Sequence, residues 1–282
     1  MVELQNTRQL PVIPFKLRNT LRNVRDATRN LLLAPEKSYR LYLKYKFKVN
    51  KTPAYPKAPW RNAVLGARQE WEDAVRQVEI LGLPRRSDLP KNWDSLAALD
   101  CILNRTDSEA RILDAGAELY STILPWLYLY GYKHLTGINV IFDRTVKRGP
   151  LQYEHGDITH TRFEENTFDV ISCLSVIEHG VNLRSYFQEA SRILKPQGVL
   201  ITSTDYFCEP IDAHDQMAYQ APVHVFCKDE IISALDIAKE CGLKLIDSIN
   251  LDCQEKPIRW EQFDLDYTFL VFTLQKVIPT SS

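Results

Sequence analysis

The sequence lacks any apolar run close to the roughly 20 residues that a membrane-spanning helix requires. Its longest apolar stretch, ILPWLYLYGY at residues 123–132, is too short for this purpose and contains Pro125. The N-terminal residues also lack the apolar core of a secretory signal peptide. These two absences predict a cytoplasmic protein that does not span a membrane.

Cysteine is present but never in the spacing that metal sites use. None of the six cysteines forms a CxxC pair, which argues against a zinc finger. Scattered single cysteines are instead typical of reduced thiols in a cytosolic protein. The sequence contains no internal repeat and no low-complexity tract.

The charges are distributed unevenly along the 282 residues. The first 50 residues hold 11 Lys or Arg and 3 acids, whereas the remainder holds 24 bases and 33 acids. A basic arm on an acidic body predicts either an anionic partner surface or docking of the arm onto its own body.

The basic arm has a helical pattern. Residues 15–33 place apolar side chains at three- and four-residue steps with basic residues between them, which predicts an amphipathic helix that ends at Pro35. Lysines and aromatic residues alternate in the next segment, SYRLYLKYKFKV. Two interpretations stay open for residues 15–50: contact with an anionic membrane or nucleic acid, or packing on the main domain with a solvated basic face.

We predict three regions along the chain. Residues 1–52 form a basic helical extension, residues 53–100 a linker and helical cover, and residues 101–282 the main domain. Three prolines within NKTPAYPKAPW indicate the linker. The cover is expected to contain helices at 62–81 and 95–103, the second with Asp94 as its N-cap.

From residue 110 onward, strand patterns alternate with helical patterns. We expect strands at 110–115, 134–140, 151–154, 168–173, 198–204, 243–249 and 267–275, and helices at 121–130, 182–194 and 228–241. This order predicts an α/β fold with a doubly wound, Rossmann-like, seven-stranded and mostly parallel sheet, in which the last strand is antiparallel. The irregular stretch 205–227 is long enough to be functional.

Four short motifs follow one another in this region: LDAG at 113–116, GD at 156–157, FDVISCLSVIEH at 168–179 and RILKPQG at 192–198. With these motifs, residues 110–275 resemble the class I S-adenosylmethionine-dependent methyltransferases, especially the type 11 enzymes that act on small molecules. The resemblance implies S-adenosylmethionine as the cofactor, bound at the carboxyl ends of the strands.

The resemblance places the methionine end of the cofactor at Asp114 and Gly116. A carboxylate at this place can meet the cofactor's ammonium group, and glycine keeps side chains away. The family's first loop usually carries further glycines two and four residues later, where this sequence has Glu118 and Tyr120. Glu118 is expected to help bind the ammonium, although both side chains are large enough to crowd the cofactor. Asp114 has an alternative interpretation as a helix cap.

The other parts of the cofactor are assigned in the same way. Asn139 stands where an acid usually holds the ribose hydroxyls, and its amide can accept one hydrogen bond and donate another. Asp157 corresponds to the residue that accepts from the adenine amino group, with Ile158 beside the ring, and Cys173 and Leu174 would lie beside the sulfonium. Asn139 and Asp157 have alternative interpretations as turn residues.

A methyl acceptor with a hydroxyl group usually needs a base within reach. The candidates are His179, His224 and Asp205, although a single histidine is more often a packing or capping residue. No metal site is expected, because the adjacent His214 and Asp215 have no assignable third ligand.

Taken together, the sequence predicts methyl transfer from S-adenosylmethionine to an oxygen or nitrogen of a small molecule, such as a sugar or glycolipid precursor. The basic arm would place the protein in the cytoplasm, peripheral to the inner face of a membrane. One alternative is a non-catalytic scaffold or membrane-tethered binding protein that keeps this fold. A nucleic-acid methyltransferase is a further alternative, but the acidic body and the absence of an NPPY-like tetrapeptide after residue 173 argue against it.

Overall fold

The computed structural model describes residues 25–49, 52–56, 62–213, 216–218 and 221–278. All seven strands expected from the sequence are present: β2 (Arg111–Ala115), β3 (His134–Asn139), β5 (Leu151–His155), β6 (Phe168–Leu174), β7 (Leu194–Tyr206), β10 (Leu243–Leu245) and β12 (Leu265–Lys276). Three short strands that were not expected join the same sheet: β1 (Ala63–Val64), β4 (Val146–Arg148) and β11 (Ile258–Trp260). The sheet is therefore ten-stranded within the described residues, not seven-stranded.

The order of the strands is that of a doubly wound sheet. Along its main path the order is β1-β12-β7-β6-β2-β3-β5-β4, and β10 and β11 also pair with β12. The inner pairs β7/β6, β6/β2, β2/β3 and β3/β5 are parallel, whereas β12 is antiparallel to β7. The prediction of a mostly parallel sheet with an antiparallel last strand is confirmed. Because Asp114 lies level with Gly137 and with Ser172, the carboxyl ends of the inner strands meet at one edge of the sheet.

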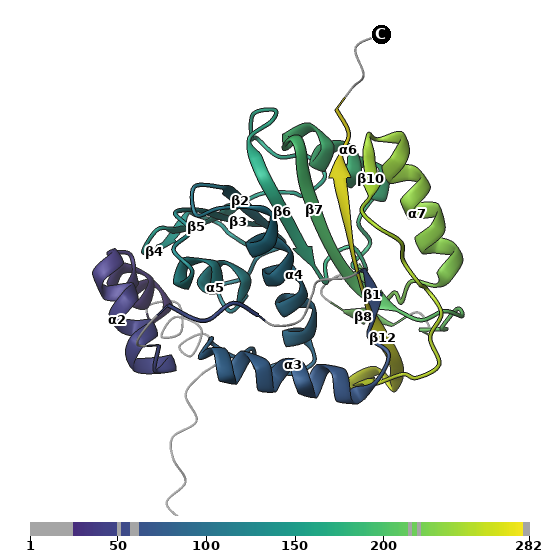
Figure 1. The fold of residues 1–282 in the computed structure, drawn as a ribbon, viewed down its shortest axis with the longest axis horizontal. Coiled ribbons are helices and arrows are strands. Elements are labelled where there is room, and N and C mark those ends of the chain that lie inside the picture. Colours follow the sequence, from purple (N-terminus) through teal and green to yellow (C-terminus); the bar gives the residue numbers. More distant parts are fainter. Residues whose placement is uncertain (1–24, 50–51, 57–61, 214–215, 219–220, 279–282) are drawn as a thin grey trace, which may run out of the picture.

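Helices cover both faces of the sheet (Figure 1). The helices of the main domain and its cover are α3 (Arg68–Leu81), α4 (Lys91–Arg105), α5 (Ile123–Leu129), α6 (Leu183–Ile193) and α7 (Lys228–Glu240). Successive side chains of a strand point to opposite faces. Accordingly, Ile112 and Ile201 pack with α4 and α5, while Leu113 and Leu200 pack with α6 and α7.

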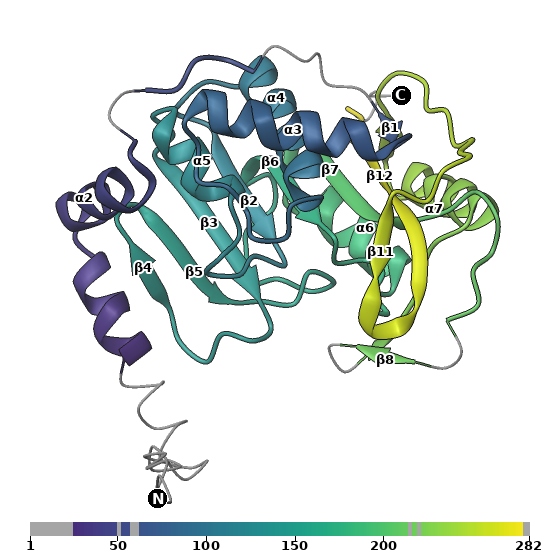
Figure 2. The same ribbon diagram turned by 90° about the horizontal axis from the view of Figure 1, so that it is seen from below.

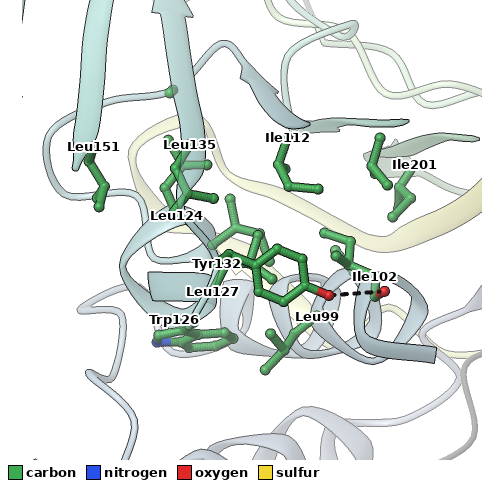
Figure 3. Close-up of a cluster of buried hydrophobic side chains, with 14 of the residues drawn as sticks. Leu99, Ile102, Ile112, Leu124, Trp126, Leu127, Tyr132, Leu135, Leu151 and Ile201 are labelled. Carbon is green, nitrogen blue, oxygen red and sulfur yellow. Dashed lines mark hydrogen bonds between the residues drawn. The ribbon is translucent and has the colours of Figure 1, made fainter. Parts of the chain in front are cut away.

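The core beneath α4 and α5 is shown in Figure 3. Ile112, Leu135 and Leu151 extend from the sheet toward the two helices. They meet Leu99 and Ile102 of α4 and Leu124 and Leu127 of α5. Each of these seven side chains is at most 2% exposed. Two aromatic residues at this layer satisfy their polar atoms locally. Trp126 Nε1 donates to the Pro84 carbonyl at 2.7 Å, and the Tyr132 hydroxyl lies 3.5 Å from the Ile102 carbonyl.

The helical cover differs from the expectation at two points. The predicted helix at 62–81 begins only at Arg68, because Ala63 and Val64 pair with β12 as a short strand at the edge of the sheet. The second helix begins at Lys91, four residues before the expected start, so Asp94 is not an N-cap but lies in the buried first turn. The first turn of this helix has buried polar residues in place of apolar ones, so the apolar periodicity of the sequence did not indicate it.

The basic arm packs on the main domain in the part that is described. Residues 25–33 are helical, and α2 (Glu36–Phe47) follows beside β4 (Figure 2). Tyr39 and Leu43 are each 2% exposed, the Tyr39 ring lies 5.6 Å from that of Tyr128, and Gly149 N donates to the Leu33 carbonyl at 3.0 Å. The interpretation of docking onto the body is confirmed for these residues. Residues 15–24 of the expected helix, and 50–51 and 57–61 of the expected linker, lie outside the described residues. The division into three regions stays a prediction.

Candidate active site

Asp114 is the last but one residue of β2 and is only 4% exposed. Its Oδ1 accepts a hydrogen bond from Ser172 Oγ of the neighbouring strand β6 at 3.0 Å. Burial raises the pKa of Asp114 to about 7, and the Ser172 hydrogen bond and the positive charge of Arg86 offset part of this rise. A carboxyl group at the end of β2 is therefore close to half protonated at neutral pH. The N-cap residue of the following helix, α5, is Thr122, so Asp114 does not cap that helix.

The first loop turns sharply at Gly116, whose φ of +89° is in the left-handed region that favours glycine. A Cβ atom at this position would lie 2.3 Å from Val176 Cγ2, so the loop after β6 packs directly against the glycine. Glu118 is half-buried, and Tyr120 is 58% exposed with its ring 5.9 Å from the Arg86 guanidinium.

Asn139 links two loops at the carboxyl ends of the strands. Its Nδ2 donates to the Gly116 carbonyl at 3.1 Å, and its Oδ1 accepts from Ile141 N at 3.2 Å. Both polar ends of the side chain are thus engaged within the protein. These contacts support the interpretation as a turn residue, and a ribose contact would have to share or replace one of them.

Asp157 lies next to Asn139, because Gly156 N donates to the Asn139 carbonyl at 3.3 Å. Asp157 is exposed, and one carboxylate oxygen accepts from Thr159 N at 2.8 Å and from Thr159 Oγ1 at 2.7 Å. The same carboxylate thus closes a tight turn of the kind that aspartate favours. Ile158 is half-buried beside it and packs against the core on the side of α6 and α7.

Cys173 and Leu174 point to opposite faces of the sheet. The Cys173 side chain is fully buried in the core with α6 and α7, and burial raises the pKa of its thiol far above its usual range. Leu174 is half-buried on the side of α4 and α5. At the end of β6, therefore, the Leu174 side chain is accessible to a ligand. Of Cys173, only the backbone lies at this strand end, because its side chain is in the core.

A buried polar cluster occupies the ends of β6 and β7 beneath α4; it consists of Lys91, Asp94, Ser175, Glu178 and Asp205. Lys91 Nζ lies 3.1 Å from Asp205 Oδ1 and also donates to the Ser175 hydroxyl. Asp94 Oδ2 accepts from Ser203 Oγ at 2.7 Å and from Ser175 Oγ at 3.5 Å. These hydrogen bonds tie the first turn of α4 to the two strand ends.

The cluster holds more carboxyl groups than cations, and this imbalance shifts their pKa values. Burial alone lowers the pKa of Lys91, but the carboxylates of Asp205, Glu178 and Asp94 outweigh it and the net shift is upward. Burial and then repulsion from Asp205 raise the pKa of Glu178 to about 8. At neutral pH the cluster thus contains a charged lysine and at least one protonated carboxyl group.

The three candidate bases have different surroundings. His179 is half-buried, and burial lowers the pKa of its imidazole, so the ring is neutral at pH 7. Asp205 is held by Lys91 within the cluster. The side chain of His224 is 42% exposed, and its Nε2 lies 3.2 Å from Glu230 Oε1 on α7. Electrostatic coupling joins His179 to Asp205, whereas the contacts of His224 are with Glu230 and with the ring of Phe226 at 4.6 Å.

Two members of the cluster, Lys91 and Asp94, had no predicted role in the site. With Ser95 they have the spacing i, i+3, i+4, which places polar side chains on one face of α4. This face is buried, and the signal in the sequence was a polar stripe on a helix that lies before the first strand of the sheet. Within the ranges that the structure describes, no group of three or more His, Cys, Asp or Glu side chains is arranged to hold a metal ion; His214 and Asp215 are outside those ranges.

Comparison with known proteins agrees with the strand order and the motifs. Residues 113–202 match a family model described as a methyltransferase domain. The chain is 29% identical to the sterol 24-C-methyltransferase of Schizosaccharomyces pombe over 109 residues. These aligned residues cover 36% of this chain and 29% of that relative. The sterol 24-C-methyltransferase of Saccharomyces cerevisiae is 28% identical over 119 residues, 39% of this chain and 30% of that relative.

These matches confirm the resemblance to the class I S-adenosylmethionine-dependent methyltransferases for the segment that contains β2 to β7. The chain spans 29% and 30% of the length of the two curated relatives. Among solved structures, an S-adenosylmethionine-dependent methyltransferase from Mesorhizobium loti is similar with a TM-score of 0.47 and 15% identity, covering 66% of this chain and 97% of that one. At this TM-score the similarity says nothing about function. The fold is defined by the order and direction of the strands in the sheet.

Proposed function

We propose that the protein transfers a methyl group from S-adenosylmethionine to an oxygen or nitrogen of a small molecule. The observation that carries this proposal is the match of residues 113–202 to the methyltransferase domain, together with Asp114, Asn139 and Asp157 at adjoining strand ends. The cofactor supplies an electrophilic methyl group on a sulfonium, so the protein mainly has to position the acceptor and exclude water.

The residues at the strand ends fit the functional groups of this cofactor. Asp114 offers a carboxyl group for the ammonium, and the buried Nε of Arg86, which has no hydrogen-bond partner among the described residues, offers a donor for the carboxylate. Asp157 and Ile158 offer an acceptor and an apolar surface for the purine. We propose Asn139 and Glu118 as the remaining contacts on the ribose and on the methionine end, and the backbone of Cys173 with the Leu174 side chain beside the sulfonium.

The buried polar cluster supports an acceptor that loses a proton. A neutral His179 can accept a proton from an O–H or N–H group at pH 7. Asp205, held by Lys91, stabilises the charge that forms on the imidazole, and we assign His224 a lesser part as a more exposed base. The curated relatives are sterol methyltransferases by name. The match to the methyltransferase-domain model covers residues 113–202 and therefore excludes Lys91 and Asp205. We therefore argue the acceptor from the cluster, and we favour a sugar or glycolipid precursor.

Isothermal titration with S-adenosylhomocysteine tests the cofactor site. We expect the wild-type protein to bind, Asp157→Ala to lose most of the affinity, and Asp157→Asn, which retains a turn-forming amide, to lose less. Asp236→Ala on the exposed face of α7 is the matched control and should bind like the wild type. Equal affinity in Asp157→Ala and the control would reject the site, whereas a folded wild type that does not bind at all would favour the non-catalytic scaffold.

The outer surface of the arm supports a membrane partner for the same protein. This arm face consists of exposed apolar side chains with basic neighbours: Leu31, Leu32, Leu41 and Tyr45 with Lys37, Arg40, Lys44 and Lys48. Apolar groups bordered by lysine and arginine complement the headgroup region of an anionic bilayer. Within the described residues, no helix has the length and hydrophobicity to cross a bilayer, so we propose surface binding.

Co-sedimentation with vesicles that contain phosphatidylserine tests the arm face. Leu41→Asp should reduce the bound fraction severalfold, because it buries a charge and removes an apolar contact. Ile80→Asp is the control, since Ile80 is 85% exposed but lies on α3. Similar binding by both variants would exclude the arm face as the contact.

A further inference from the structure

A cavity of about 570 Å³ lies between the basic arm and the first loop of the sheet, a volume typical of small-molecule sites. Helix 25–33 and α2 form one wall, and residues 118–122 of the first loop form another. Six cationic side chains line it, compared with two acidic ones, Asp26 and Glu118. The cations are Arg25, Arg29, Lys46, Arg85, Arg86 and Arg148.

Arg148 is a buried cation without a negative partner among the described residues. Arg148 is only 7% exposed. Its two terminal nitrogens donate to uncharged groups, Nη1 to the Leu119 carbonyl at 2.7 Å and Nη2 to Asn30 Oδ1 at 3.2 Å. Its Nε is buried and has no hydrogen-bond partner in the described part of the chain. Burial, with added repulsion from Arg29, lowers the pKa of Arg148. A buried charge that is paired only with neutral groups is costly unless an anion joins it.

Two further cations of the wall converge on a single phenol. Arg29 Nη2 lies 2.7 Å and Lys46 Nζ 2.8 Å from the Tyr42 hydroxyl. Neither Arg29 nor Lys46 forms an ion pair with a carboxylate of the described residues. Two positive groups on one hydroxyl repel each other, and an anion placed between them would relieve that repulsion.

A second unpartnered polar atom and several aromatic rings complete the wall. Thr122 is 5% exposed, and its Oγ1 has no partner among the described residues. Tyr39, Tyr42 and Phe47 line the cavity from α2, and Tyr120 lines it from the first loop. The cavity therefore combines donors for an oxyanion with apolar surfaces for a ring or a short chain.

We propose that this cavity binds a small organic phosphate, with the phosphate between Arg148, Arg29 and Lys46 and the organic part against the aromatic rings. A phosphate dianion has enough acceptor oxygens to meet several guanidinium and ammonium groups at once. The phosphate comes either from a soluble ester or from the headgroup of a lipid that reaches the arm. The three proposed phosphate contacts, Arg148, Arg29 and Lys46, are distinct from Asp114, Asn139 and Asp157, so phosphate binding can be tested apart from methyl transfer. The cavity does adjoin the proposed cofactor site, because Arg86 and Glu118 line it as well.

Titration of the full chain with phenyl phosphate at constant ionic strength tests this proposal. Binding should be saturable, and phenol without the phosphate should not bind. Lys46→Gln and Arg29→Gln should each weaken binding about tenfold, because each removes one charge-assisted contact. Lys44→Gln is the matched control, since Lys44 lies on the same helix as Lys46 but on the exposed face outside the cavity.

The remaining arms separate the sources of the phosphate and the neighbouring site. If phenyl phosphate does not bind, weaker binding of Lys46→Gln than of Lys147→Gln to vesicles with phosphatidic acid would assign the phosphate to a lipid. Lys147 is the control here because it is an exposed lysine of β4 that lies outside both the cavity and the arm face. Saturating S-adenosylhomocysteine should leave phenyl phosphate binding unchanged; competition would show that the cavity belongs to the cofactor site and overturn the proposal. Equal loss in Lys44→Gln and Lys46→Gln, or no binding of either probe by the folded protein, would also overturn it.

Discussion

At the scale of single residues, burial keeps two carboxyl groups close to their protonated forms at neutral pH. Asp114 has a pKa raised to about 7 and Glu178 one raised to about 8, in each case first by burial. Folding therefore binds protons on both groups at pH values above their ordinary pKa. The contribution of these two groups to stability is complete at pH values below their pKa values in the unfolded chain. It is lost as the pH rises through their raised pKa values in the folded protein.

Glu178→Gln should flatten the pH dependence of stability. In the wild type, the free energy of unfolding is expected to fall as the pH rises from about 6 to about 8, by at most about 1.4 kcal/mol per pH unit for each of the two groups. Glutamine stays neutral, so the contribution of Glu178 to this decline should disappear and only that of Asp114 should remain. Urea denaturation across this range measures the effect.

The control for this prediction is Glu255→Gln, an exposed substitution that should retain the wild-type slope. A wild-type stability that stays constant or rises between pH 7 and 8 would contradict the raised pKa of Glu178.

Sequence reasoning placed candidate site residues at the ends of strands, and it missed candidates that lie elsewhere. Asp114, Asn139 and Asp157 could be placed because parallel strands end at a common edge, and apolar runs show where strands end. The side chain of Cys173 was assigned to the wrong surroundings, since strand alternation turns it into the core with α6 and α7. Lys91 and Asp94 could not be found, because their partners Asp205 and Ser203 are more than 100 residues away in the sequence.

At the scale of elements, α4 is the helix that connects the cover to the candidate active site. Its first turn is buried by polar contacts to the ends of β6 and β7, whereas its later turns carry Leu99 and Ile102 into the apolar core. The position of α4 on the sheet therefore depends on both kinds of contact. Figure 2 shows α3 beside α4.

Lys91→Met should destabilise the protein by about 3–5 kcal/mol, because it leaves the buried carboxylates of Asp205 and Asp94 without their cation. The double variant Lys91→Met with Asp205→Asn should cost clearly less than the sum of the two single variants, since it removes both charges. Denaturant titration of the four proteins gives the coupling energy.

The exposed pair Arg76 and Asp73 on α3 provides the comparison for that cycle. Removing one partner there should change the stability only slightly, since solvent screens the pair. Additive costs for Lys91 and Asp205 would show that the buried pair does not hold α4 in place.

Elements with an apolar pattern over several residues were predictable, and elements without such a pattern were not. The strand expected at 243–249 was predictable in this way, although only its three residues Leu243–Leu245 form β10. The seven expected strands are found because each has an apolar pattern over several residues. β1, β4 and β11 have only two or three residues each, so their pairing is set by the neighbouring strand and leaves no periodic pattern. The early start of α4 was hidden for the related reason that its first turn is polar and buried.

At the scale of the whole molecule, the opposite charges of arm and body have separate consequences. The body carries the acidic groups of the candidate active site, and the arm contributes three of the six cations of the cavity, Arg25, Arg29 and Lys46. The arm is packed on the body through buried Tyr39 and Leu43, while its arm face stays exposed. We infer that the arm serves both to complete a binding site and to present a surface to a membrane.

The central claim is that S-adenosylmethionine binds at the carboxyl ends of β2, β3 and β5. The most direct measurement is an experimental structure of the protein with S-adenosylhomocysteine. We predict the methionine end beside Asp114 and Gly116 and the purine beside Asp157 and Ile158. A nucleoside located instead between the arm and Arg148, or a complex in which Val176 still covers Gly116 and no ligand occupies the strand ends, would contradict the account.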